Sequence, residues 1–281
     1  MKLTNTNTDI YVPDGVDVEE ALKRTTHLAI GAHQDDLEIM AYHGIAECYE
    51  KENKWFTGVI LTNGAGSPRT GKYAECTDED MQKLRQEEQR KAAKSGKYSC
   101  MLQLMYSSSQ IKDASNSDPA NDIRLIMESA VPETVYLHNP ADKHDTHVAS
   151  LLRALTAIRT LPHDKQPSKV YGCEVWRDLD WLDDKEKQTL AVDKYPELAA
   201  SLMGFYESQI SGGKRYDLAA QGRRLANATF FESHGVDEAE GLTFAMDLTP
   251  LIKSNTLSIT EYTLAFIEKF KTDVKARLEK L

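Results

Sequence analysis

Two polar segments of this sequence carry the residues best suited to chemistry. The first, Ala32-His33-Gln34-Asp35-Asp36, follows the apolar run His27–Ile30, and the second, His138 to His147, follows the run Thr134–Leu137. In an open α/β sheet, residues just past the carboxyl ends of parallel strands converge on one crevice. Two histidines and a carboxylate form the ligand set of a catalytic zinc, and a spare carboxylate suits a general base. We therefore expect five side chains to meet there: His33, Asp35, Asp36, His144 and His147.

These segments resemble motifs of the PIG-L-like zinc deacetylases, a family that removes N-acetyl groups from glucosamine derivatives. The first family motif is roughly Ala-His-Pro-Asp-Asp-Glu, here Ala32 to Glu38 with Gln34 in place of proline, and the second is roughly His-Pro-Asp-His, here His144-Asp145-Thr146-His147. Further matches are an Arg-x-x-Glu, a small-residue helix ending in glycine, and a late Ser-Gln pair: Arg85 to Glu88, Ala92 to Gly96, and Ser208-Gln209. The resemblance covers about residues 26–210.

The resemblance implies a role for each matched residue. His33, Asp36 and His147 would bind zinc, although Fe²⁺ can occupy the same kind of site. Asp35 would be the general base, and His144 would stabilise the oxyanion or protonate the leaving amine. Arg85 would hold sugar hydroxyls at the rim of the pocket. The alternatives from the residues alone are an Asp pair that caps a helix, surface histidines, and an arginine paired with Glu88.

Besides Gln34, the sequence departs from the family pattern in two places. Asp145-Thr146 replaces the Pro-Asp between the histidines, so the acid that orients His144 is shifted or replaced, and Asp142 is a candidate for that role. The family also often carries a sugar-binding aspartate after the third strand. Here that stretch is Tyr106-Ser107-Ser108-Ser109, so the identity of the sugar does not carry over.

The stretch Gly66 to Lys72 matches the Gly-x4-Gly-Lys skeleton of a P-loop. Tyr73 follows in place of the Ser or Thr that binds Mg²⁺, and the helical pattern begins only near Thr77. No helix N-terminus would therefore meet the phosphates, which makes nucleotide binding a minor alternative. We interpret the stretch as an active-site loop whose Arg69 and Lys72 contact an anionic or hydroxyl-rich substrate.

Composition restricts the class of protein. The chain has 281 residues, 41% of them apolar and 28% charged, which is ordinary for a globular protein. A net charge of −10 argues against a nucleic-acid partner. No apolar run has the length of a membrane span, and the first residues lack the apolar core of a signal peptide. With four scattered cysteines and no Cys-x-x-Cys, we expect a cytoplasmic protein with reduced thiols.

Short apolar runs alternate with helical patterns, which predicts a Rossmann-like three-layer α/β/α sandwich with a mostly parallel sheet. The expected strands are His27–Gly31, Phe56–Leu61, Met101–Tyr106, Thr134–His138 and Val170–Val175. The expected helices are Asp36–Glu52, Asp78–Ser95, Asn121–Ser129 and Thr146–Leu161. We place a metal-binding catalytic domain at 1–175 and a C-terminal extension, packed on the same domain, at 176–281. That extension should hold helical residues at 195–225, one or two strands within 227–257, and a final helix after Ser258.

Several later residues have two interpretations. Glu174 and Trp176 stand where substrate contacts are expected at the end of a strand. Arg223 and Arg224, together with the segment Glu232 to Gly235, either line the far wall of the site or form an ion-pair network. The apolar face of the last helix predicts packing, or alternatively a homo-oligomer contact.

Together these observations predict a metal-dependent amidohydrolase. Its substrate would be a small N-acylated, N-acetylglucosamine-type amino sugar or a glycoconjugate of one. The alternative from another class is a catalytically inactive sugar-binding protein. The presence of Asp35 favours the enzyme, because binding alone does not need a base at that position.

Overall fold

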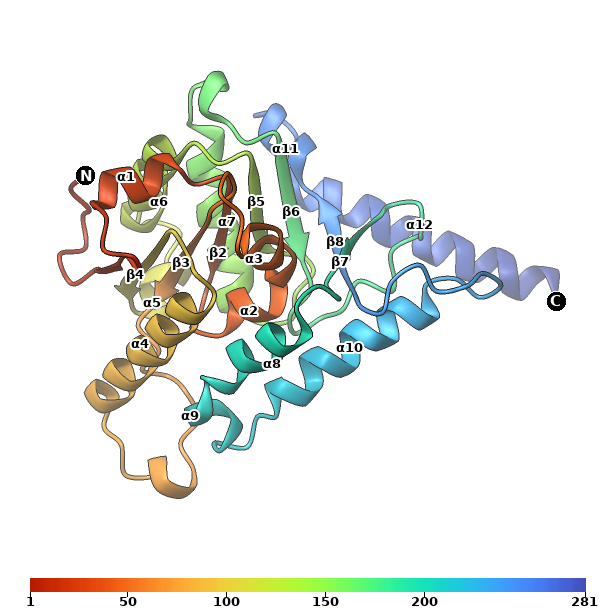
Figure 1. Ribbon diagram of the computed structural model, residues 1–281. Helices are drawn as coiled ribbons and strands as arrows, with labels where there is room; N and C mark the ends of the chain where they lie inside the picture. Colours follow the sequence, from red (N-terminus) through yellow and green to blue (C-terminus); the bar gives the residue numbers. More distant parts are fainter.

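The computed structural model describes residues 1–281 and contains one eight-stranded sheet with helices on both faces (Figure 1). The strand order is β1-β4-β3-β2-β5-β6-β8-β7. The five strands β2 to β6 are mutually parallel and occupy the middle of the sheet. At one edge β1 runs antiparallel to β4, and near the other edge β8 runs antiparallel to both β6 and β7. The strands are β1 (Asp9–Tyr11), β2 (His27–Gly31), β3 (Phe56–Thr62), β4 (Cys100–Tyr106), β5 (Thr134–His138), β6 (Lys169–Cys173), β7 (Lys187–Ala191) and β8 (Leu242–Asp247).

Twelve α-helices and two short 3₁₀ helices accompany the sheet. In the first half these are α1 (Val18–Lys23), α2 (Asp36–Met40), α3 (Tyr42–Cys48), η1 (Gly71–Tyr73), α4 (Asp78–Ser95), α5 (Ser108–Lys112) and α6 (Asp118–Ala130). In the second half they are α7 (Asp145–Arg159), η2 (His163–Lys165), α8 (Pro196–Gly204), α9 (Glu207–Ile210), α10 (Tyr216–Phe230), α11 (Thr249–Lys253) and α12 (Ile259–Lys280).

The two faces of the sheet bury separate hydrophobic cores, which gives the predicted three-layer sandwich. On β2, Leu28 and Ile30 belong to the core covered by α1, α6 and α7, whereas Ala29 between them belongs to the core covered by α2, α3, α4 and α8. This alternation follows from the two-residue period of a strand. Because β2 is buried on both faces, its sequence is a continuous apolar run, as is typical of parallel strands.

The predicted elements of the parallel region are confirmed, most of them within two residues. The strands His27–Gly31 and Thr134–His138 and the helix Asp78–Ser95 have the predicted bounds. The predicted helix Asp36–Glu52 is shorter and is broken at Ala41 into α2 and α3. It ends at Cys48, because Tyr49 leaves the helical region with ψ 125° and Glu50 then adopts a left-handed conformation with φ 57°.

The C-terminal residues complete the same sheet. β8 pairs antiparallel with β6, and β7 then pairs antiparallel with β8. Between them, the residues predicted as helical at 195–225 form α8, α9 and most of α10. Of the one or two strands expected within 227–257, the structure has β8 alone. Strands β1 and β7 were not predicted, because the first has three residues and the second is a polar edge strand.

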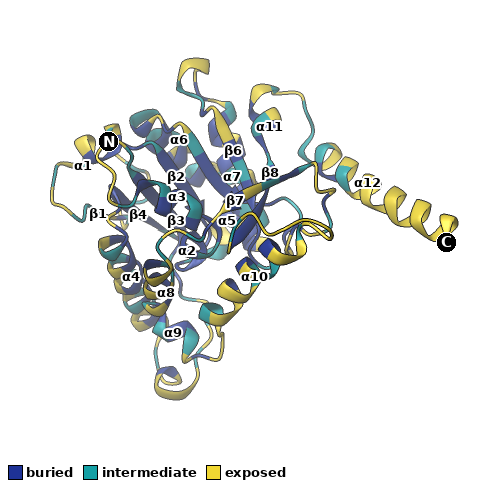
Figure 2. Ribbon diagram, turned by 45° about the vertical axis from the view of Figure 1, so that its right-hand side comes forward, coloured by how far each residue is buried: buried dark blue, intermediate teal, exposed yellow.

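The last helix, α12, lies at one side of the molecule and extends beyond it (Figures 1 and 2). Its first turns pack against the core through Ile259, Tyr262 and Phe266. Further along, Ile267, Phe270 and Val274 are exposed, so the predicted packing holds only for the beginning of the helix. None of the helices combines the length and apolar character that a membrane span requires.

Candidate metal centre

The site lies where the direction of the sheet connections reverses. From β2 the chain proceeds through β3 and β4 toward one edge, and it returns to place β5 and β6 on the other side of β2. The loops that leave the carboxyl ends of β2 and β5 therefore diverge and leave a crevice between them, which is where α/β proteins bind their ligands. His33 follows β2, and both His144 and His147 follow β5.

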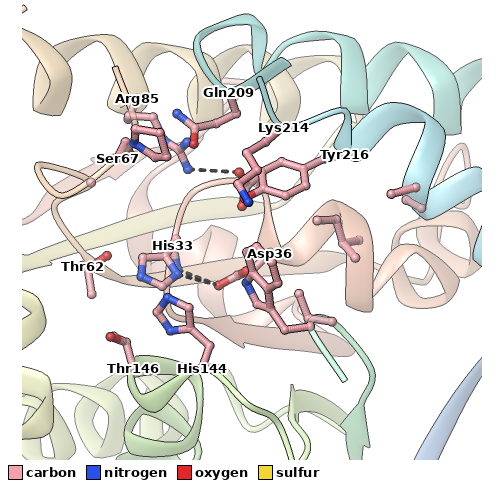
Figure 3. A pocket seen from close by; sticks show the side chains of 18 of the residues that line it. His33, Asp36, Thr62, Ser67, Arg85, His144, Thr146, Gln209, Lys214 and Tyr216 are labelled. Carbon is pink, nitrogen blue, oxygen red and sulfur yellow. Dashed lines mark hydrogen bonds and ion pairs between the residues drawn. The ribbon is translucent and has the colours of Figure 1, made fainter. Parts of the chain in front are cut away.

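Three ligand-type side chains meet in this crevice. Nδ1 of His33 lies 3.2 Å from Nε2 of His147 and 3.5 Å from Oδ2 of Asp36. Nε2 of His147 lies 3.4 Å from Oδ1 of Asp36. One donor atom from each residue thus falls within 4.8 Å of the others, and Asp36 and His147 are buried. The structure brings together the three residues that the sequence predicted as metal ligands. Figure 3 shows two of them, His33 and Asp36, near His144.

The electrostatics of this group favour a bound cation. Burial opposes a charged imidazole at His147, but the nearby Asp36 and Asp142 carboxylates outweigh it and raise the pKa of His147. Burial would raise the pKa of Asp36, yet His147 and His138 hold that pKa well below its ordinary range. Burial lowers the pKa of His33 and so favours its neutral, metal-binding form.

Asp35 is held beside this group in a strained conformation. It is the N-cap residue of α2 and has a left-handed backbone, with φ 93°. Strain of this kind costs on the order of 1–3 kcal/mol and persists only where the surroundings enforce it. Here the Asp35 N–H donates to Gln89 Oε1 over 3.3 Å. Burial raises the pKa of Asp35 to about 7, against the opposing effect of Arg85.

Arg85 lies behind Asp35, in a place that the sequence did not predict. Its guanidinium donates to the Gln34 carbonyl and to Asp35 Oδ2, the latter over 3.2 Å. The side chain reaches the wall of the cavity but is 1% exposed, so it is not at the rim. The rest of the Arg-x-x-Glu match has another partner: Glu88 accepts the N–H of Ser208 over 2.8 Å and its hydroxyl over 2.7 Å.

The Ser208–Glu88 contact brings the segment around α9 over the site. Gln209, the second member of the Ser-Gln pair, lines the cavity. Nearby, Tyr206 and Tyr98 each donate a hydroxyl over 2.6 Å to Glu38, the last residue of the first motif. Buried hydrogen bonds thus join three of the motifs: the first motif, the Arg-x-x-Glu match and the Ser-Gln pair.

Asp142 contacts a different histidine from the one predicted. Its Oδ2 lies 3.4 Å from Nδ1 of His147, and its Oδ1 accepts only the backbone N–H of His144, over 3.0 Å. Asp142 therefore fixes the ring of His147, which is the contact that a metal-binding histidine commonly needs. The ring of His144 stacks on that of His147 at 4.5 Å and lines the cavity, and its Nδ1 has no hydrogen-bond partner.

His138 belongs to the same cluster, although no role was predicted for it. Its ring is fully buried and stacks on that of His147 at 3.9 Å. Nε2 of His138 accepts the N–H of Ala32 over 3.0 Å and lies 3.2 Å from Oδ2 of Asp36. It therefore links the ends of β2 and β5 at the base of the site. Its position as the last residue of a buried strand was the available signal.

Above this cluster opens a cavity of about 530 Å³. The loop after β3 contributes Gly64, Gly66 and Ser67 to its wall. Gly64 has φ +76°, and a Cβ there would lie 2.8 Å from Oε1 of Gln34 and 3.1 Å from Arg85. The loop therefore approaches the first motif closely because this residue is glycine.

The structure does not bring Arg69 and Lys72 to the cavity. Arg69 pairs with Asp78, and Nζ of Lys72 lies 2.8 Å from Glu207. Only the 3₁₀ turn η1 follows Gly71, and α4 begins at Asp78, so no helix N-terminus receives the P-loop-like stretch. Both the substrate contacts expected of these two residues and the phosphate-binding alternative lack support from this geometry.

The far wall of the cavity comes from the C-terminal part of the chain. The residues just after β6 and those at the start of α10 face the histidine cluster across the cavity, and Figure 3 shows Lys214 and Tyr216 on this side. This wall includes Glu174, Trp176, Lys214, Tyr216, Arg223 and Arg224. Of the two late polar segments, Arg223 and Arg224 therefore reach the site, whereas Glu232 to Gly235 do not line it.

This geometry agrees with a comparison against known families. The model of the PIG-L family, described as GlcNAc-PI de-N-acetylase, matches residues 28–158, which contain both motif segments. Over these residues the chain is similar to the PIG-L family. Comparison of the sequence with curated proteins gives no match.

Solved structures share the fold of this chain. The N,N'-diacetylchitobiose deacetylase from Pyrococcus horikoshii matches with a TM-score of 0.59 and 15% identity, over 81% of this chain and 86% of that one. The 4-carboxy-2-hydroxymuconate hydratase GalB from Pseudomonas putida KT2440 matches with a TM-score of 0.57 and 16% identity, over 80% and 95%. The A40926 pseudoaglycone deacetylase matches with a TM-score of 0.57 and 17% identity, over 80% and 97%. At these identities the similarity establishes the α/β fold.

Proposed function

We propose that this protein is a metal-dependent hydrolase that removes an N-acyl group, typically acetyl, from an amino sugar of the N-acetylglucosamine type or from its conjugate. The observation that carries the proposal is the convergence of His33, Asp36 and His147 at the base of a cavity that Asp35 and His144 also line. This arrangement provides a three-residue metal site with a separate carboxylate and a separate imidazole facing the same space.

The residues present fit a divalent metal. Two imidazoles and one carboxylate are the ligands of many hydrolytic zinc sites, and Fe²⁺ accepts the same set. Asp142 and His138 support the ligands from behind. When bound, zinc would act as a Lewis acid toward the acyl carbonyl and would make a water molecule more acidic.

Asp35 is placed to act as the general base. Its carboxylate takes a proton from the water that attacks the carbonyl carbon, and a pKa of about 7 suits that task near neutral pH. Arg85 holds the carboxylate through a hydrogen bond of 3.2 Å to Oδ2. His144, whose side chain lines the cavity, donates a hydrogen bond to the developing oxyanion.

The reaction then ends in cleavage of the C–N bond. The nitrogen leaves as an amine with a proton returned by Asp35 or supplied by His144, and the acyl group leaves as a carboxylate. The products are an amino sugar and, for an acetyl group, acetate. Only water is consumed, so no oxidant, reductant or nucleotide is required.

The comparisons support this proposal over the non-catalytic alternative. The matching family is described by a de-N-acetylase activity, and two of the structural neighbours carry deacetylase names. A protein that only binds sugars has no need for a strained, buried Asp35 beside the metal ligands. The hydratase among the neighbours has the same fold, so the fold alone does not select the reaction.

Metal analysis followed by an amine-release screen tests the proposal. We expect close to one divalent metal per chain, most often zinc, and release of a primary amine from at least one N-acetylated amino sugar. Removal of the metal with a chelator should abolish the release, and added Zn²⁺ should restore it. Metal-loaded protein that releases no amine from any neutral or charged N-acetyl sugar would overturn the proposal.

A further inference from the structure

The far wall of the cavity carries positive charges that no acidic side chain neutralises. Lys214, Arg223 and Arg224 line it from the segment that begins and forms α10, and none of the three makes an ion pair with an acid. Three such cations along one cavity wall contrast with the chain as a whole, which has 44 acidic and 34 basic residues and a net charge of −10. We refer to these three residues and Trp176 as the α10 wall.

Trp176 positions the lysine of this wall without cancelling its charge. Nζ of Lys214 lies 5.0 Å from the centroid of the Trp176 ring, in a cation–π contact. The same ring stacks at 6.2 Å against His144, on the metal side of the cavity. One aromatic ring thus separates the metal centre from the ammonium, so two groups on a single sugar can reach both.

The two arginines are anchored by backbone carbonyls. Arg223 donates to the carbonyl of Val175, and Arg224 donates to the carbonyl of Glu38 over 2.7 Å. Arg224 is 9% exposed, and the carbonyl contact fixes its position beside the cavity. Its Nε has no hydrogen-bond partner. Carbonyls orient a guanidinium but leave its full charge in place.

The nearest acid, Glu174, is occupied by other donors. Its Oε1 accepts from Asn227 and from the N–H of Phe244, and its Oε2 accepts the N–H of Leu179 over 3.1 Å. Glu174 therefore serves to hold α10 and β8 together, and it forms no ion pair with either arginine, although the charge of Arg223 opposes the rise that burial causes in its pKa. The charge of the α10 wall remains available to a ligand.

We propose that the α10 wall is a binding subsite for an anionic group, a phosphate or a carboxylate, that the acylated sugar itself carries. The inference rests on the proposed function for the other end of the substrate, where the acyl group meets the metal centre. Lys214 and Arg223 bind the anion, and Arg224 adds positive charge from behind. Substrates with this group are selected over neutral sugars by the α10 wall.

Equilibrium binding with matched sugars tests the subsite directly. The probes are N-acetylglucosamine, its 1-phosphate and 6-phosphate, and the sugar whose C6 is a carboxylate. Binding is measured by calorimetry on metal-loaded Asp35→Asn protein, in which turnover is blocked. Since a hydrogen bond to a charged group contributes about 1.5–3 kcal/mol, we expect at least one anionic sugar to bind about tenfold or more tightly than the neutral one. The preferred probe identifies the anion as phosphate or carboxylate.

Substitutions then assign that preference to residues. Lys214→Gln and Arg223→Gln, in the same background, should each reduce the advantage of the anionic sugar several-fold. Lys253→Gln, on α11 and away from the cavity, is the matched control and should keep it. Equal binding of neutral and anionic sugars, or an advantage that survives Lys214→Gln combined with Arg223→Gln, would overturn the inference.

The outcomes separate this inference from the proposed function. If anionic sugars bind preferentially but the wild-type protein releases no amine, the proposed subsite is supported and the proposed hydrolase function is wrong. If neutral and anionic sugars bind and react equally well, the hydrolysis stands and the subsite is wrong. Inorganic phosphate that binds as tightly as the sugar phosphate would show a site for a free anion, and would overturn the claim that the substrate carries the charge.

Discussion

The two ends of the cavity treat charge in opposite ways. At the metal centre, Asp36 contacts His33, His138 and His147, and the neighbouring Asp35 is paired with Arg85. At the α10 wall, Lys214 and Arg223 face the cavity without an acid. The first end is organised by the fold itself, with buried groups that fix one another. The cations of the second end have no acidic partner in the protein, so a bound ligand must supply the opposite charge. The first arrangement suits catalysis, and the second suits selection of the substrate.

Among substitutions that distinguish the two ends of the cavity, removal of a metal ligand should have the largest effect on metal content and activity. His147→Ala deletes the imidazole that contacts both His33 and Asp36, so we expect loss of the metal and a fall in activity of about 10³-fold or more, because the metal supplies several kcal/mol. Elemental analysis and amine release measure both effects. His163→Ala, an exposed histidine of η2, is the control and should retain both. Full metal content in His147→Ala would reject the ligand set.

Replacement of the base should separate chemistry from metal binding. Asp35→Asn keeps the size of the side chain, and asparagine also tolerates a left-handed backbone, so the fold and the metal should be retained. An amide accepts no proton from water, and we expect kcat to fall about 10²–10⁴-fold. Asp145→Asn, the same change at an exposed site nearby, should leave kcat within about twofold of wild type. If kcat of Asp35→Asn falls by less than tenfold, Asp35 is excluded as the base.

The two histidines of the second motif should respond differently. His144 lines the cavity without contacting Asp142 through its ring, whereas the ring of His147 lies between Asp36 and Asp142. His144→Ala should therefore keep its metal and lose about 10²-fold in kcat, the usual contribution of a proton-transfer group. Metal analysis of the two alanine variants side by side is the test. The roles are reversed if His144→Ala empties the site and His147→Ala does not.

Asp142 should affect the metal without touching the substrate. Its carboxylate faces Nδ1 of His147 and accepts the N–H groups of His144 and Trp176. Asp142→Asn removes the charge that orients the ring, and such changes typically weaken metal binding about 10–100-fold. Competition with a chelator measures this affinity. Asp113→Asn, on an exposed loop, is the control, and an unchanged affinity in Asp142→Asn would remove Asp142 from the metal centre.

The metal centre is largely predictable from the sequence because its residues follow local rules. Apolar runs such as Thr134–Leu137 identify parallel strands, and the residues just beyond them must converge at one edge of the sheet. This rule groups His33, Asp35, Asp36, His144 and His147. The family resemblance then selects His33, Asp36 and His147 as the ligands. The direction in which each side chain points is harder to predict from the sequence. Arg85 was expected at the rim, but it is buried because the Gln34 carbonyl and Asp35 accept its hydrogen bonds.

The α10 wall is much less predictable, since no local pattern marks it. Lys214 and Arg223 belong to a helix and its approach that pack on the sheet through long-range contacts. Trp176 reaches the same cavity from the end of β6. The sequence suggests Arg223 and Arg224 only as one of two interpretations, because the path of the chain after residue 176 decides which surface they face.

Ionic strength should produce the smallest effect, and it compares the two ends directly. The Debye length shortens from about 10 Å at 0.1 M salt to about 3 Å at 1 M, so exposed charges such as Lys214 are screened while buried ones are screened far less. For the anionic sugar that binds best, we expect the dissociation constant to rise several-fold between about 0.05 M and 0.5 M sodium chloride. The affinity for neutral N-acetylglucosamine and the metal content should stay constant.

The pattern of these three measurements matters more than the size of any one of them. A salt effect on the anionic sugar alone places the screened interaction at the α10 wall, because both sugars share the contacts at the metal centre. An equal effect on both sugars would mean that salt acts on the shared contacts, and the division of the cavity would be wrong. Loss of metal at high salt would contradict the buried, mutually paired arrangement of Asp36 and His147.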